Sequence, residues 1–395
     1  MKNFRNLALC AVALAALAAC GGGGGDDATT ATALESAAAR GPARASFSRL
    51  VSFGDSLSDV GSYKTPGVAY LGGGQYTVNG GANTNWTEVL ALKVALQAPC
   101  AAQTGLESSG PLAGLAAPIT NHAGCFAYGQ GGARVTNPIG IANKALLQYG
   151  IAAGALGQLT DPIVNQIGRH LAATGGRFDG RELVTVLGGG NDLFVALDTL
   201  QATLAAGGDP ATAVPAAFAA MAQSGAELAS YVNNMIVGNG ARHVVVVNLP
   251  NIGTSPSATA GTRDLITALV TAFNTQLANG VAGTRGVLLV DAFAASQDQA
   301  AHPERYGLRN VTTPACDFSR MVIPSSLVCS AATAVVPDVS RYQFADTVHP
   351  TPYGYRLLAR TVARSMRRAE WLGPGEACDR LADDADDCTR PSDER

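Results

Sequence analysis

Four short runs of apolar residues recur along this chain, and each ends in, or is followed by, glycine, asparagine or aspartate. They occupy residues 49–53, 183–187, 243–248 and 287–291. Patterns with helical spacing of apolar residues occur at residues 85–96, 156–173, 211–237, 262–278 and 353–366, with Thr84 as a candidate cap for the first. Strands that are apolar throughout are typical of a parallel sheet covered by helices on both faces. We therefore expect an α/β fold, a three-layer α/β/α sandwich around a parallel sheet of about five strands.

Two segments at opposite ends of the chain carry the groups that nucleophilic catalysis needs. Phe53-Gly-Asp-Ser-Leu-Ser-Asp59 follows the first apolar run and places Ser56 at a tight turn. Asp346-Thr-Val-His349-Pro lies near the other end and offers a carboxylate and an imidazole three residues apart. A serine, a general base and a carboxylate that orients the base are the trio that acyl transfer uses. In parallel sheets such groups meet beyond the carboxyl ends of the strands.

Four blocks of the chain together resemble the GDSL, or SGNH, family of serine esterases and lipases. The blocks are Phe53–Gly61, Phe126–Arg134, Gly189–Asp192 and Asp346–His349, and they span about residues 49 to 365. The resemblance implies an SGNH hydrolase-like, flavodoxin-like sheet arrangement. It also implies a catalytic set of Ser56, Asp346 and His349, and no cofactor.

The same resemblance implies an oxyanion hole built from three donors. They are the Ser56 N–H, the Gly132 N–H and the side-chain amide of Asn191. An additional glycine after Tyr128 loosens the second block, so Gly131 is an alternative to Gly132. Glycine suits this position because its backbone can approach a ligand without a side-chain clash.

The function expected from the resemblance is hydrolysis of carboxylic esters through an acyl-enzyme, with a small-molecule or lipid ester as the substrate. Two alternatives remain open: transfer of a lipid acyl chain to an alcohol, and a non-catalytic surface lipoprotein that keeps the fold. The chain has 27 basic and 30 acidic residues. This mildly acidic balance argues against nucleic-acid binding. No obligate protein partner is evident.

The N-terminal segment has the pattern of an export signal. Lys2 and Arg5 precede an apolar run that ends in Leu17-Ala-Ala-Cys20, which resembles the bacterial lipobox. We expect residues 1–19 to be a lipoprotein signal peptide and Cys20 to be lipidated. Residues 20–45 read as a flexible tether, residues 46–371 as the hydrolase domain and residues 372–395 as an acidic tail. The expected location is exported and lipid-anchored to the outer membrane, with a periplasmic or secreted protein as the alternative.

Six cysteines remain after Cys10 and Cys20 are set aside. An even number in an exported protein indicates disulfides, and six cysteines allow 15 pairings. The simplest pairs join neighbours: Cys100 with Cys125, Cys316 with Cys329, and Cys378 with Cys388. None of them has the spacing of a zinc site, so we expect no metal.

Substrate specificity is expected in the long loops, at residues 62–84, 97–125 and 294–343. Their aromatic residues Tyr63, Tyr70, Tyr76 and Tyr306 are candidate pocket walls. Four further histidines lack a partner acid in a family motif. We expect His243 to begin a strand, and His122, His170 and His302 to lie on loop or helix surfaces. Asp55 is expected to be a structural hydrogen-bonding residue.

Overall fold

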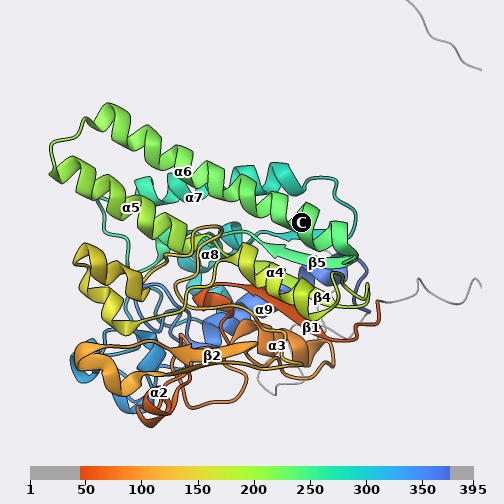
Figure 1. The fold of residues 1–395 in the computed structure, drawn as a ribbon, viewed down its shortest axis with the longest axis horizontal. Helices are drawn as coiled ribbons and strands as arrows, with labels where there is room; N and C mark the ends of the chain where they lie inside the picture. Colours follow the sequence, from red (N-terminus) through yellow and green to blue (C-terminus); the bar gives the residue numbers. More distant parts are fainter. Residues whose placement is uncertain (1–44, 374–395) are drawn as a thin grey trace, which may run out of the picture. The chain divides into compact units, whose positions relative to one another are not determined.

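The computed structural model describes residues 45–373, and its central element is a parallel sheet. Within these residues the sheet has four strands in the order β1-β4-β5-β6. Figure 1 labels β1, β4 and β5, which lie next to one another. Their bounds are Leu50–Gly54, Leu183–Leu187, His243–Val247 and Val287–Val290. The expected number of about five strands was therefore slightly high. The segment around Ala127 lies parallel beside β1, to which it forms one isolated bridge, at Ser52; Ala127 also bridges to Ala101.

Alternate residues of each strand face two separate apolar layers. Val244 and Val246 of β5 point into one layer, whereas Val245 and Val247 point into the other. The first layer is closed by α4, α5, α6 and α7, which span Ile163–Ala173, Gly190–Ala205, Pro210–Tyr231 and Arg263–Val281. The second is closed by α3, Trp86–Lys93, and α9, Pro352–Arg368. The strands are thus buried on both faces, which confirms the expected three-layer α/β/α arrangement.

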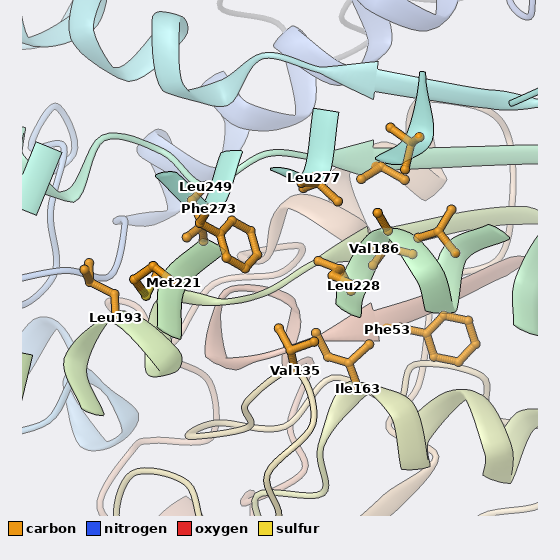
Figure 2. Packing of buried hydrophobic residues seen from close by; sticks show 14 of the residues in the cluster. Phe53, Val135, Ile163, Val186, Leu193, Met221, Leu228, Leu249, Phe273 and Leu277 are labelled. Atoms are coloured by element: carbon orange, nitrogen blue, oxygen red, sulfur yellow. The ribbon is translucent and has the colours of Figure 1, made fainter. Parts of the chain in front are cut away.

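Figure 2 shows the first of these layers at close range. Phe53 of β1 and Val186 of β4 lie on its sheet side, and Ile163 of α4, Met221 of α6 and Phe273 of α7 lie on its helix side. All five side chains are almost completely buried. Burying a side chain of this size stabilises the fold by about 1.5–3 kcal/mol, which makes this layer a main source of stability.

Several helix boundaries differ from the expectation. Asn85, not Thr84, caps α3, because its side chain and that of Glu88 form a reciprocal capping box. Helix α5 was not among the helical patterns expected; it begins at Gly190, with Gly189 at its N-cap. Other elements within residues expected to be loops are α2, Pro66–Tyr70, α8, Ala292–Ala301, and the antiparallel pair β2, Gln103–Leu106, with β3, Ala117–Asn121.

Two disulfides lie within the described residues. Cys100 pairs with Cys125, and Cys316 pairs with Cys329, as the neighbour rule predicted. The third expected pair, Cys378 with Cys388, lies outside the described residues, as do the expected signal peptide and Cys20. None of the helices within residues 45–373 has the length and apolar character needed to span a bilayer.

Candidate active site

Ser56 sits on a tight turn at the carboxyl end of β1. Gly54 ends the strand against β4, where a Cβ would lie only 2.3 Å from the Leu187 carbonyl oxygen. The chain then enters the 3₁₀ turn η1, Ser56–Ser58, which Asp55 caps by accepting a hydrogen bond from the Leu57 N–H at 3.0 Å. Asp55 therefore has the structural role expected of it. Ser56 is 8% exposed, so its hydroxyl lies at the edge of the buried region.

Asp346 and His349 are presented by a loop that folds onto its own carboxylate. Asp346 Oδ1 accepts hydrogen bonds from the backbone N–H groups of Val348, at 2.9 Å, and His349, at 2.7 Å. The Ala345 N–H donates to the His349 carbonyl at 2.7 Å and closes the loop. Aspartate favours such turns because its side chain replaces a backbone acceptor. The spacing of three residues thereby brings the imidazole back beside the carboxylate.

The structure brings Ser56, His349 and Asp346 into one line of hydrogen bonds. His349 Nε2 lies 2.8 Å from Ser56 Oγ, and His349 Nδ1 lies 2.7 Å from Asp346 Oδ2. The remaining side of this carboxylate oxygen accepts the Ser326 N–H at 3.2 Å. The distance from His349 Nε2 to Ser56 Oγ is within the range for direct proton transfer, and the distance from Nδ1 to Asp346 is that of a hydrogen bond that orients the ring.

The charges of the two titratable partners support each other. Burial opposes ionisation of Asp346, but the charge of His349 and hydrogen bonds from His349 and Ser326 outweigh it and hold the Asp346 pKa well below its usual value. Burial also opposes a charged imidazole, yet Asp346, with a smaller contribution from Asp55, raises the pKa of His349 above its ordinary value. Asp346 thus stays ionised while His349 can take up a proton.

Three residues with candidate donors, Ser56, Gly132 and Asn191, line the cavity beside Ser56 Oγ. The backbone N–H groups of Ser56 and Gly132 have no acceptor among residues 45–373. The Asn191 amide donates one hydrogen to the Ala133 carbonyl at 2.8 Å, which leaves its second hydrogen available. Gly131, the alternative donor, is already engaged, because its N–H donates to Asp59 Oδ2 at 2.9 Å. The geometry therefore favours Gly132 over Gly131.

The segment that carries Gly132 is fastened to the sheet edge. Ser52 of β1 donates to the Phe126 carbonyl at 3.0 Å and accepts from the Tyr128 N–H at 2.7 Å. At its other end, Asp192 accepts hydrogen bonds from the Val135 N–H at 3.0 Å and from Arg134 Nε at 3.1 Å. Asp192 follows Asn191 at the start of α5, so one helix terminus holds both the segment and the amide.

A cavity of about 340 Å³ opens beside Ser56, His349 and the three donors. Its apolar lining includes Ile141, Leu156, Phe194, Ile252, Phe318, Pro324 and Phe344. Its polar lining includes Asn251, Thr254, Ser255, Ser296 and Gln343. Residues 294–343 contribute to these walls as expected, but residues 97–125 contribute none. The segments 141–158 and 249–255 also line the cavity, although no motif marked them.

Only one of the four expected pocket tyrosines lines the cavity. Tyr76 does so, and its ring packs against His349 with centroids 4.9 Å apart. Tyr63 is fully buried behind it, whereas Tyr70 is 91% exposed on α2. Tyr306 hydrogen-bonds Asp298 away from the site. The expectation for Tyr63, Tyr70 and Tyr306 was therefore wrong.

The histidine expectations need one correction. His243 begins β5 as expected, but His170 is fully buried in α4 and not on its surface. The rings of Phe53, Tyr128 and Phe178 surround it, among others. Burial lowers the pKa of His170 to about 4, so the ring is neutral. No group of three His, Cys, Asp or Glu residues in the described part of the chain is arranged to hold a metal ion.

Comparisons with known proteins agree with this geometry. A family model described as GDSL-like Lipase/Acylhydrolase matches residues 50–362. The GDSL esterase/lipase EXL2 of Arabidopsis thaliana is 29% identical over 134 residues, which cover 30% of this chain and 35% of EXL2. The Arabidopsis GDSL esterase/lipase At1g06990 is 28% identical over 76 residues, covering 19% of this chain and 21% of that protein. The chain thus spans about a third or less of the length of these curated relatives.

One solved structure is similar over a larger share of the chain. It is the crystal structure of LAE5, an alpha/beta hydrolase enzyme from the metagenome of Lake Arreo, Spain. The match has a TM-score of 0.38 at 15% identity and covers 83% of this chain and 98% of LAE5.

Proposed function

Because the chain belongs to the GDSL-like lipase/acylhydrolase family, we propose that it is a serine esterase that cleaves carboxylic esters through an acyl-enzyme at Ser56. The observation that carries this proposal is the line of hydrogen bonds from Ser56 through His349 to Asp346 at the mouth of a cavity. Such an arrangement activates a serine hydroxyl, which is a poor nucleophile by itself.

The first half of the reaction forms the acyl-enzyme. His349 Nε2 takes the proton of Ser56 Oγ as this oxygen attacks the ester carbonyl carbon. The negative charge that develops on the carbonyl oxygen is stabilised by the donors of Ser56, Gly132 and Asn191. Collapse of the intermediate breaks the bond to the alcohol oxygen, and this oxygen takes the proton from His349.

The second half regenerates the enzyme. His349 takes a proton from water, and the resulting hydroxide attacks the acyl carbon at Ser56. The acid leaves as Ser56 Oγ regains the proton from His349. Asp346 remains ionised throughout, which its depressed pKa permits. It holds the Nδ1–H tautomer and stabilises the imidazolium that forms in each half.

The cavity supports a short or medium acyl group as the preferred substrate part. Its volume of about 340 Å³ is near the lower end of the range of about 300–1,000 Å³ for small-molecule sites. Its apolar residues suit a hydrocarbon chain, and its polar residues suit the alcohol part of an ester. Transfer of the acyl chain to an alcohol remains the alternative, since any alcohol that replaces water in the second half gives a new ester.

The test of the proposal is hydrolysis of p-nitrophenyl esters with acyl chains from two to sixteen carbons, by the wild type and Ser56→Ala. We expect the variant to lose about 10⁶-fold in kcat, because no nucleophile replaces the hydroxyl. Mass spectrometry of the wild type with a serine-reactive phosphonate should place the adduct on Ser56. Equal activity in both proteins would overturn the assignment. A new ester formed in competition with hydrolysis when an alcohol is added would support acyl transfer.

We also propose export and attachment to the outer membrane through a lipid on Cys20. The support is the sequence of residues 1–20, which lies outside the described structure. Expression of the full chain and of Cys20→Ala in a Gram-negative host tests the anchor. The wild type should sediment with the outer membrane, and the variant should not. Equal sedimentation of the two proteins would contradict the proposal.

A further inference from the structure

Gly131 is held on three sides by buried polar side chains. Its N–H donates to Asp59, and its carbonyl oxygen accepts a hydrogen bond from the Tyr63 hydroxyl at 2.8 Å. The hydrogen-bond network orients the Gln158 amide so that its nitrogen donates to the same carbonyl at 3.1 Å and its oxygen accepts from the Tyr76 hydroxyl. A Cβ on Gly131 would lie 2.1 Å from that hydroxyl oxygen, so Tyr76 packs directly on the glycine.

The carbonyl of Gly131 belongs to the same peptide group as the N–H of Gly132. A trans peptide is planar, and its C=O and N–H bonds point in opposite directions. Whatever fixes the direction of the Gly131 carbonyl therefore fixes the direction of the Gly132 N–H. Tyr63 and Gln158 hold the carbonyl, while Gly132 lines the cavity.

We propose that Tyr63, Gln158 and Tyr76 are positioning residues that aim the Gly132 N–H at the oxyanion. The inference rests on the proposed serine esterase function, and it adds three residues that lie outside the family's motif blocks in this chain. None of them needs to touch the reacting atoms. They act through one peptide group, which Tyr63 and Gln158 hold by its oxygen and Tyr76 supports from the side.

Burial makes this network rigid and its polar groups costly to leave unpaired. Tyr63 is 0% exposed and Gln158 is 4% exposed. A buried hydroxyl or amide costs about 1–3 kcal/mol without a partner, so each group keeps its hydrogen bonds. Burial also raises the pKa of Tyr63 and of Tyr76 well above the ordinary value, which keeps both hydroxyls protonated as donors. A residue that only filled space here would need no hydroxyl.

Tyr76 connects the network to the base. Its ring packs against the His349 imidazole at an interplanar angle of 33°, and its hydroxyl meets Gln158. One side chain thus contacts both the group that moves the proton and the network that orients the oxyanion donor. Tyr63, in contrast, lines no part of the cavity and is not in ring contact with His349. Besides donating to Gly131, its hydroxyl accepts a hydrogen bond from the buried Thr160 N–H at 3.2 Å.

The test compares Tyr63→Phe and Gln158→Met with the wild type on p-nitrophenyl butyrate. Tyr353→Phe is the matched control, since Tyr353 is also a buried tyrosine whose hydroxyl donates to a backbone carbonyl, that of Tyr306 at 2.7 Å. Complete loss of an oxyanion donor costs roughly 10²–10³ in rate, so a misaimed donor should cost about 10-fold or more. We expect Tyr63→Phe to lower kcat by that factor with KM and the pH profile unchanged.

A second readout is the rate of inactivation by a phosphonate, whose tetrahedral adduct places an oxygen in the same hole. It should fall in Tyr63→Phe in proportion to kcat and remain at the wild-type rate in Tyr353→Phe. Activity of Tyr63→Phe and Gln158→Met within twofold of the control would overturn the inference, as would a shifted pH profile in Tyr63→Phe. A fully active Ser56→Ala would overturn the proposed function and this inference together. An inactive Ser56→Ala beside a fully active Tyr63→Phe would overturn only the inference.

Discussion

Removing the disulfide between Cys316 and Cys329 should lower both stability and activity. The bond joins cysteines 13 residues apart, and the loop-closure entropy of such a loop stabilises the folded state by about 3 kcal/mol. The closed loop contains Ser326, whose N–H donates to Asp346, and Phe318 and Pro324 of the cavity wall. Loosening it displaces the carboxylate that orients His349. A displacement of about 1 Å can cost as much as 10²-fold, so we expect kcat/KM to fall about 10- to 100-fold.

The disulfide between Cys100 and Cys125 provides the matched control. Its cysteines are 25 residues apart, and by the same relation this disulfide stabilises the folded state by about 3.5 kcal/mol. None of the cavity-lining residues lies in the loop that it closes. The variant with both of these cysteines changed to alanine should therefore lose similar stability and keep kcat/KM within about twofold.

Urea unfolding at 25 °C measures the free energy of unfolding of both double-alanine variants. Initial rates on p-nitrophenyl butyrate, without urea and where each variant is folded, measure kcat/KM. Wild-type kcat/KM in the variant without Cys316 and Cys329 would refute the link between this loop and Asp346. An equal loss of activity in both variants would refute the claim that the effect is local.

Three further predictions concern single residues. Asp346→Asn should lower kcat about 10³–10⁴-fold, because the variant favours the wrong tautomer of His349. The kcat/KM of the wild type should rise with pH through a midpoint above 6.5, where His349 becomes neutral, and this midpoint should move to lower pH in the variant. Gly131→Ala should lower kcat about 100-fold, because its Cβ would meet the Tyr76 hydroxyl and shift the turn; unchanged rates would contradict the close packing. His170 has a pKa of about 4 in the folded protein and of 6.5 in the unfolded chain. The free energy of unfolding of the wild type should therefore fall by about 3 kcal/mol as the pH falls through that range. Urea unfolding of His170→Phe should show this part of the fall removed.

The sheet and the meeting of Ser56, His349 and Asp346 were predictable, because their signals are local or come from motifs. The run of four valines at 244–247 reads as a buried strand by itself. The glycines before Asn191 concealed the start of α5, since glycine has low helix propensity and Gly189 adopts a φ of 112°. The burial of His170 had a signal that was missed. It lies seven residues after Ile163 and three after Ile167, on the buried face of α4.

The network around Gly131 had no comparable signal. Tyr63, Tyr76 and Gln158 are spread over almost a hundred residues, and neither periodicity nor a motif connects them. They meet only because separate loops fold together around Gly131. Contacts of this kind depend on tertiary packing, and a single sequence does not encode them as a pattern. The choice between Gly131 and Gly132 likewise required the position of Asp59.

The separation of 293 residues between Ser56 and His349 determines when the proposed esterase could first act. At a synthesis rate of about 5–20 residues per second, roughly 15 to 60 seconds pass after Ser56 is made before its base exists. Ser56 is therefore an ordinary alcohol in every nascent chain, whatever has already folded around it. By the proposed mechanism, a chain whose translation stops before residue 349 lacks the base for Ser56 and should not cleave esters. If the proposed activity is correct, ester cleavage will report that nearly the whole domain has been made and assembled.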